Sequence, residues 1–285
     1  MKPATFAYHA PRTVEEAVTQ LAEFAPRDGR ILAGGQSLVP MMAFRMARPA
    51  HLIDINGVEG LEQLAIDNNV LSISACVRHA AFHRRVAPGP TGALLSAVAS
   101  HIAHYPIRIR GTFCGSLANA DPASEWCLTA VTLNAELIAA SQRGRRTIAA
   151  ADFFTGMMGT ALAEDELLVE AGLPMLATDA RCGFYEFSRR AGDYALAMAL
   201  TVYRLKDGVV TEPRVGIGGA EGHPRRIAEA EAVLAGQKPS DEIFRAAADA
   251  VAEAIEPIED ANADAAFRLD LVRAVTQRAL ERTLA

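Results

Sequence analysis

Residues 111–122 read GTFCGSLANADP, a segment in which each of two glycines is followed directly by a residue with a hydroxyl side chain. Glycine lets backbone N–H groups approach a ligand closely, and the hydroxyl groups of Thr112 and Ser116 can donate hydrogen bonds. A helix is expected to begin shortly afterwards, near residue 124. The segment therefore indicates a cradle for a phosphate or pyrophosphate group. An ordinary turn explains this segment, taken alone, equally well.

A second loop of the same character lies upstream, where residues 33–38 read AGGQSL. A short buried strand is expected before it, at 30–33, and a helix after it, with Ser37 as N-cap. Neither loop carries the G-x-G-x-x-G of a Rossmann fold, and no G-x-x-x-x-G-K-[ST] of an ATPase occurs in the chain. If the loops bind a nucleotide, they do so on a different fold.

The remaining pattern predicts an α+β chain. Thr13 and Glu16 form a capping box for a helix over 13–26, and strands are expected at 51–55, 136–140, 147–149 and 165–173. Two hairpins are expected, one around Asn68-Asn69 and one around Asp207-Gly208, followed by Ala-rich helices from 225 onward. Residues 177–181 are polar and poor in β-branched side chains. The predicted domains are therefore 1–177 and 178–285.

Composition excludes several classes of protein. The 285 residues are 51% hydrophobic and carry a net charge of −6, which favours a globular fold and disfavours nucleic acid as a partner. No two of the 4 cysteines have the spacing of a zinc or iron–sulfur motif. The longest apolar stretch, 194–203, is too short for a membrane span, and the N-terminus lacks a signal sequence. We therefore expect a cytoplasmic protein.

Three motifs in this order resemble a known family. AGGQSL at 33–38, T-x-x-G-S-L-A-N-A-D-P at 112–122 and RAGDYALA at 190–197 are similar to the FAD-binding medium subunit of the molybdenum hydroxylases, the carbon monoxide dehydrogenase and xanthine dehydrogenase group. The resemblance extends over essentially the whole chain. It implies a two-lobed FAD-binding domain of the vanillyl-alcohol-oxidase (PCMH) type, followed by a C-terminal domain with a small antiparallel sheet and helices.

The resemblance also assigns positions around the FAD. The first loop would wrap the pyrophosphate and the second would close over it, Glu125 would bind the adenosine ribose, and Leu168 and Tyr194 would lie by the flavin ring. The full set is Ala33, Gly34, Gly35, Gln36, Ser37, Leu38, Thr112, Cys114, Gly115, Ser116, Ala118, Asp121, Glu125, Leu168 and Tyr194. This chain departs from the family at Cys114, where relatives usually have glycine, and at 185–187, where some relatives have a basic residue.

The implied activity is electron transfer through non-covalently bound FAD. A small subunit with [2Fe-2S] clusters and a large subunit with the molybdenum cofactor would be the partners, in a dimer of heterotrimers. No catalytic residue or metal ligand is expected in this chain. The alternatives are a stand-alone FAD-dependent oxidoreductase on the same fold and a scaffold that has lost its flavin.

Two pairs of residues near the motifs suggest structure rather than chemistry. His79 and His83 have the i, i+4 spacing of metal ligands, but without a third ligand nearby they are interpreted as histidines on a helix surface. Trp126 and Cys127 are interpreted as core residues of the helix that follows the second loop.

Overall fold

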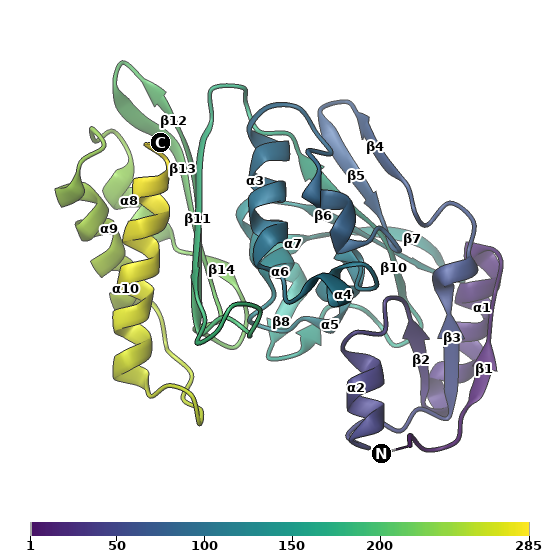
Figure 1. Cartoon of the computed structure of the whole chain (residues 1–285). Helices are drawn as coiled ribbons and strands as arrows, with labels where there is room; N and C mark the ends of the chain where they lie inside the picture. The colour runs from purple at the N-terminus through teal and green to yellow at the C-terminus, as the bar shows by residue number, and fades with distance from the viewer. Residues whose placement is uncertain (1, 285) are drawn as a thin grey trace.

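The computed structural model describes residues 2–284, which form two lobes and a C-terminal domain side by side (Figure 1). The N-terminal lobe is a three-stranded parallel sheet of order β1-β3-β2 with helix α1 against it. Thr13 caps α1 by accepting a hydrogen bond from the N–H of Glu16, as the capping box predicts. The elements are β1 (Ala7–His9), α1 (Val14–Phe24), β2 (Gly29–Leu32), α2 (Leu38–Ala43) and β3 (His51–Asp54).

The second lobe is a five-stranded antiparallel sheet of order β4-β5-β10-β6-β7. Asn68 and Asn69 form the predicted hairpin turn, with φ of 46° and 64°, a conformation that asparagine tolerates well. The strands of this sheet are β4 (Leu64–Asp67), β5 (Val70–Ser74), β6 (Glu136–Ser141), β7 (Gly144–Ala149) and β10 (Leu167–Pro174), and β8 (Phe154–Gly156) and β9 (Gly159–Thr160) form a separate two-stranded antiparallel sheet. The helices are α3 (Gly89–His101), α4 (Tyr105–Arg108), α5 (Phe113–Asn119), α6 (Glu125–Thr132) and α7 (Ala150–Phe153).

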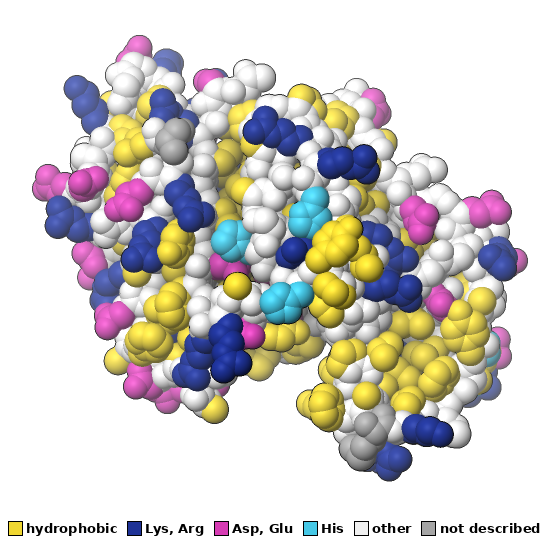
Figure 2. Space-filling view, viewed as in Figure 1, with side chains coloured by type: hydrophobic (Ala, Val, Ile, Leu, Met, Phe, Trp, Pro, Cys, Tyr) yellow, Lys and Arg dark blue, Asp and Glu magenta, His cyan; other side chains and the backbone are white. Residues whose placement is uncertain are grey.

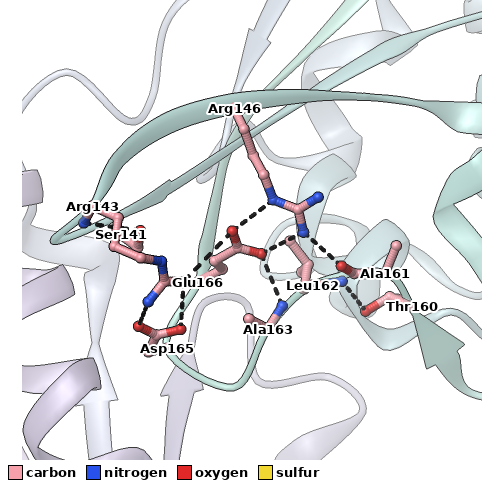
Figure 3. Close-up of polar contacts among 9 residues, drawn as sticks. All are labelled: Ser141, Arg143, Arg146, Thr160, Ala161, Leu162, Ala163, Asp165 and Glu166. Carbon is pink, nitrogen blue, oxygen red and sulfur yellow. Dashed lines mark hydrogen bonds and ion pairs between the residues drawn. The ribbon is translucent and has the colours of Figure 1, made fainter.

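An ion-pair network fastens the β6–β7 hairpin to the loop before β10 (Figure 3). Arg146 binds both carboxylate oxygens of Glu166 at 2.7 Å, and Arg143 pairs with Asp165. Glu166 also accepts from the N–H of Ala163 at 2.8 Å. Because both arginines are about half exposed, the network contributes modestly to stability. It fixes the course of the loop that enters β10.

The C-terminal domain is a four-stranded antiparallel sheet of order β11-β12-β13-β14 with helices on one face (Figure 1). The predicted hairpin at Asp207-Gly208 is present; its first strand begins at Ala197, and Tyr194 lies in the loop before this strand. Strand β11 was not predicted, because it carries no β-branched residue. The elements are β11 (Arg181–Phe187), β12 (Ala197–Lys206), β13 (Val209–Gly218), β14 (Arg225–Arg226), α8 (Ala228–Leu234), α9 (Asp241–Ala254) and α10 (Ala265–Arg282).

Two hydrophobic clusters lie on opposite faces of the C-terminal sheet. Met198, Leu200 and Val202 of β12 belong to the core of the second lobe, whereas the alternate residues Ala199 and Tyr203 belong to the cluster beneath α8–α10. Because successive side chains of a strand point to opposite faces, one face of this sheet packs on the second lobe and the other on the C-terminal helices. Within residues 2–284, no helix has the length and apolar character needed to cross a membrane.

Candidate functional site

The two loops that the sequence singles out lie against each other between the lobes. A Cβ atom on Gly34 would come within 2.4 Å of the carbonyl oxygen of Arg110 and 2.6 Å of the Cα atom of Gly111. Such distances are shorter than any real Cβ contact, so only glycine at 34 allows this approach. The loop after β2 and the segment before α5 therefore form one unit, although they are far apart in the sequence.

A cavity of about 370 Å³ opens between these loops. Its floor is the first loop, in which the backbone N–H groups of Gly34, Gly35, Gln36 and Ser37 find no hydrogen-bond partner within residues 2–284. Gly35 has φ of 71°, the left-handed conformation that helps successive N–H groups turn toward one side. Predicted site residues that line the cavity are Ala33, Gly34, Gly35, Gln36, Ser37, Leu38, Thr112, Gly115, Ser116 and Ala118.

The structure shows why position 115 requires glycine, which the sequence did not reveal. The Thr112 hydroxyl caps α5 by accepting from the N–H of Gly115 at 3.0 Å, and a Cβ on Gly115 would lie 2.5 Å from that hydroxyl oxygen. The N–H of Gly115 is thus already used inside the protein. Glycine at this position preserves the cap of α5, and the unpartnered donors of the cavity come from the first loop.

Cys114 leaves the cavity open because its side chain points away from it. The residue is 2% exposed, and its sulfur lies 3.5 Å from the carbonyl oxygen of Ile73 in β5. Burial, and to a smaller extent the nearby Cys76 and Glu170, raises the pKa of the Cys114 thiol. The thiol is therefore a poor nucleophile. Cysteine in place of the family's usual glycine at 114 therefore does not narrow the cavity.

A polar brace that sequence reasoning missed connects the two loops from behind. Asn56 donates from Nδ2 to the carbonyl of Ala33 at 2.7 Å, and Arg78 donates both to Oδ1 of Asn56 and to the carbonyl of Arg110. The three contributing segments are separated by more than 20 residues. No short motif links such residues, so only the fold could reveal them.

The interpretation of His79 as a helix-surface residue is wrong. It begins a 3₁₀ helix (His79–His83), is 4% exposed, and accepts at Nδ1 a hydrogen bond of 2.9 Å from the indole N–H of Trp126. Burial, together with the charges of Arg78 and Arg108, lowers the pKa of His79 to about 3. Its ring lines the cavity, whereas His83 is exposed as predicted. Trp126 and Cys127 are fully buried, which confirms their assignment to the core.

Further predicted residues lie beyond the cavity. Asp121 and Tyr194 line a second cavity, of about 540 Å³, against the C-terminal domain, and Tyr194 is 68% exposed. Leu168 is 4% exposed within β10. Neither Leu168, Glu125 nor the Cys114 side chain lines either cavity. The structure thus gathers ten of the predicted residues around one cavity and leaves the other five outside it.

A third cavity, of about 430 Å³, lies where α3 and α4 meet β11. Figure 2 shows histidine and arginine side chains gathered beside an acidic one at this junction. Glu186 approaches His101 Nδ1 at 3.5 Å, while Oε2 of Glu186 and Nε of Arg108 are buried and have no partner within residues 2–284. One carboxylate oxygen of Glu186 and one N–H of Arg108 therefore remain without a hydrogen-bond partner at this junction.

Comparison with known proteins identifies the family. Residues 4–176 match the family described as "FAD binding domain in molybdopterin dehydrogenase", and residues 183–283 match "CO dehydrogenase flavoprotein C-terminal domain". The chain is 38% identical to the nicotine 6-hydroxylase medium subunit of Paenarthrobacter nicotinovorans, over 98% of each protein.

Two solved structures agree. Carbon monoxide dehydrogenase from Hydrogenophaga pseudoflava superimposes with a TM-score of 0.93 at 33% identity, covering 100% of this chain and 99% of that one. Quinoline 2-oxidoreductase from Pseudomonas putida 86 gives a TM-score of 0.92 at 35% identity, covering 99% and 98%. The resemblance and the fold class expected from the three motifs are confirmed. The chain belongs to the family of FAD-binding medium subunits of the molybdenum hydroxylases.

Proposed function

We propose that this chain holds the diphosphate of FAD in the cavity between its two loops and passes electrons through the bound flavin. The observation that carries the proposal is the row of unpartnered N–H groups over Gly34–Ser37, four half-buried residues that line the cavity, because successive free backbone donors form a nest that binds anions. The donors point to an anionic ligand, and a diphosphate supplies several acceptor oxygens. The residues present therefore fit the group that the family binds.

Each part of the chain has a distinct task in this proposal. The first loop donates hydrogen bonds to the diphosphate, and the Asn56–Arg78 brace keeps that loop in place. Asp121 and Glu125 are carboxyl groups farther along, suited to accept hydrogen bonds from ribose or ribityl hydroxyls. Leu168 and Tyr194 are proposed to lie beside the ring. When bound, the flavin supplies the redox chemistry, and the protein supplies its position and electrostatic surroundings.

The proposal includes partner subunits. Several relatives are named medium subunits or medium chains, and we infer that this chain likewise assembles with a small iron–sulfur subunit and a large molybdenum subunit. A dimer of heterotrimers and a cytoplasmic location are the further expectations. We place the domain boundary at 177/178, which is supported by family matches that end at 176 and resume at 183.

The chain alone and the chain with its partners provide the test. Purified alone and loaded with FAD, it should be bleached by dithionite but not by N-heterocyclic substrates. Co-expressed with the two partner subunits, it should co-purify with iron and molybdenum, and its flavin should bleach when substrate is added. Stopped-flow absorbance at the flavin band measures both. Rapid substrate-driven bleaching of the isolated chain would instead identify a stand-alone oxidoreductase.

A further inference from the structure

The buried imidazole of His79 has one nitrogen engaged and one nitrogen without a partner. Trp126 donates from Nε1 to Nδ1 of His79 at 2.9 Å, and Trp126 itself is fully buried. The other edge of the ring, with Nε2 and Cδ2, lies against Gly111, where an added Cβ would come within 2.5 Å of Nε2. Within residues 2–284, Nε2 makes no hydrogen bond. That edge belongs to the lining of the cavity between the two loops.

The contact with Trp126 decides which tautomer His79 adopts. An indole N–H can only donate, so Nδ1 must be the unprotonated acceptor. Because the ring is neutral at physiological pH, its single proton must then reside on Nε2. Two independent features, the Trp126 contact and the neutrality of the ring, thus produce a fixed N–H donor beside Gly111. Nε2 is not among the fully buried unpartnered side-chain atoms of residues 2–284, so this donor is open to the cavity and to a ligand within it.

We propose that His79, held in the Nε2–H tautomer by Trp126, donates a hydrogen bond from Nε2 to a diphosphate oxygen of the ligand in this cavity. This inference rests on the proposed function, since it takes the ligand to be FAD. The donor would act from beside Gly111, whereas the N–H groups of Gly34–Ser37 act from the first loop. As a neutral donor it adds no charge to the site. Trp126 acts as a positioning residue, because it reaches the ligand only through His79.

Two substitutions at His79 separate the two nitrogens. Asn places its amide near the position of Nδ1, so His79→Asn can still accept from Trp126 but loses the donor at Nε2. Gln reaches farther, so His79→Gln restores an N–H near Nε2. We expect His79→Asn to weaken binding of FAD and of ADP by the same factor, about ten-fold or more, and His79→Gln to retain most of the affinity. Riboflavin, which has no phosphate, should bind both variants as it binds the wild type.

Trp126→Phe tests the positioning role. Without the indole donor, the two neutral tautomers of His79 can exchange, and if half of the molecules keep the Nε2 proton, affinity falls about two-fold. This effect should disappear in the His79→Asn background, where there is no tautomer to select. Nitrogen-15 NMR of the imidazole provides a direct readout. The wild type should show a protonated Nε2 whose signal shifts on addition of ADP, and Trp126→Phe should show both tautomers.

Affinities are measured by flavin fluorescence for FAD and by calorimetry for ADP, on apoproteins whose thermal unfolding is recorded in parallel. The control is His83→Asn, an exposed residue on the same 3₁₀ helix, which should leave affinity unchanged. If His79→Asn does not fold, His79→Gln and the NMR experiment still decide the question. Wild-type FAD affinity in a folded His79→Asn, or an Nδ1–H tautomer in the wild type, would overturn the inference while the proposed function stands. Failure of the wild type to bind FAD would overturn the function itself.

Discussion

Glu186 lies close enough to Glu125, across the junction of the two domains, for its charge to help raise the pKa of Glu125. Glu125 is the first residue of α6 in the FAD-binding domain, and Glu186 lies on β11 of the C-terminal sheet. Desolvation of Glu125, reinforced by the charge of Glu186 and less by Asp121, raises the pKa of Glu125 to about 8, and the hydrogen bond from its own backbone and the charge of Arg108 offset only part of this rise. The apoprotein therefore carries a carboxyl group that resists ionisation at neutral pH.

The raised pKa of Glu125 predicts a stability that depends on pH. Between pH 4.5 and about 8 the folded apoprotein holds a proton that the unfolded chain has released, so its free energy of unfolding falls as pH rises. For this group the slope is at most about 1.4 kcal/mol per pH unit. Glu125→Gln should remove this dependence, and Glu186→Gln should move it to lower pH. Urea unfolding at several pH values measures it; equal slopes in wild type and Glu125→Gln would contradict the assignment.

Gly35 provides a test of the first loop. Gly35→Val should abolish FAD binding while the chain still folds, because a side chain at φ of 71° strains the backbone and its Cβ would press on Leu32 and Val39 at 3.2 Å. Loss of two hydrogen bonds to a charged group costs about 3–6 kcal/mol, enough to empty the site at micromolar FAD. The control is Gly60→Val, with φ of 80° and no atom within 4 Å. Normal FAD affinity in Gly35→Val would refute the role of the loop.

Gly34 tests whether the two loops must touch. Gly34→Ala adds only a methyl group, but this group would lie 2.6 Å from the Cα atom of Gly111, so the loops must separate. We expect a loss of FAD affinity of about ten-fold or more, together with a lower thermal midpoint of the apoprotein. Gly222→Ala is the matched control, since its nearest atom lies at an ordinary 3.7 Å. Titration of flavin fluorescence compares the two variants, and equal affinities would show that loop contact does not matter.

The brace behind the loops predicts a loss of affinity without direct contact with the ligand. Arg78→Met removes the donors that hold Asn56 and the carbonyl of Arg110, so the two loops lose their connection. FAD affinity should fall about ten-fold, and the apoprotein should unfold at lower denaturant concentration. Arg27→Met, which breaks an exposed pair with Glu23, should change neither quantity appreciably.

Cys114 gives one prediction about whether FAD is covalently attached and one about the stability of the fold. Acid precipitation should release all flavin into the supernatant as FAD, because the thiol is buried against β5 and faces away from the cavity. Cys114→Gly restores the glycine that relatives usually have at this position. The structure predicts that this substitution leaves FAD affinity unchanged and lowers stability by about 2 kcal/mol, because it creates a cavity in the core and places a glycine within α5. Thermal unfolding and FAD titration distinguish these outcomes.

Local sequence was sufficient for several elements and for recognising the two glycine-bearing segments, but it missed strand β11 and helix α5, which lies within the second segment. The hairpins at Asn68-Asn69 and Asp207-Gly208 and the capped helix after Thr13 are specified by neighbouring residues, so short-range rules predict them. The glycine-rich loops were recognisable for the same reason, since each is continuous in the chain. Their order along the sequence was enough to indicate the family and the cofactor.

Only the tertiary structure decided how these parts act together. The contact of Gly34 with Gly111, the brace through Asn56 and Arg78, and the bond from Trp126 to His79 join segments with no fixed spacing in sequence. The pattern around His79 indicated an exposed helix, and burial beside Trp126 overrode it. Hydrogen-bond pairing, desolvation and steric contact depend on distances in space. Sequence therefore determined which residues form the loops, and folding determined which donors remain free to bind the cofactor.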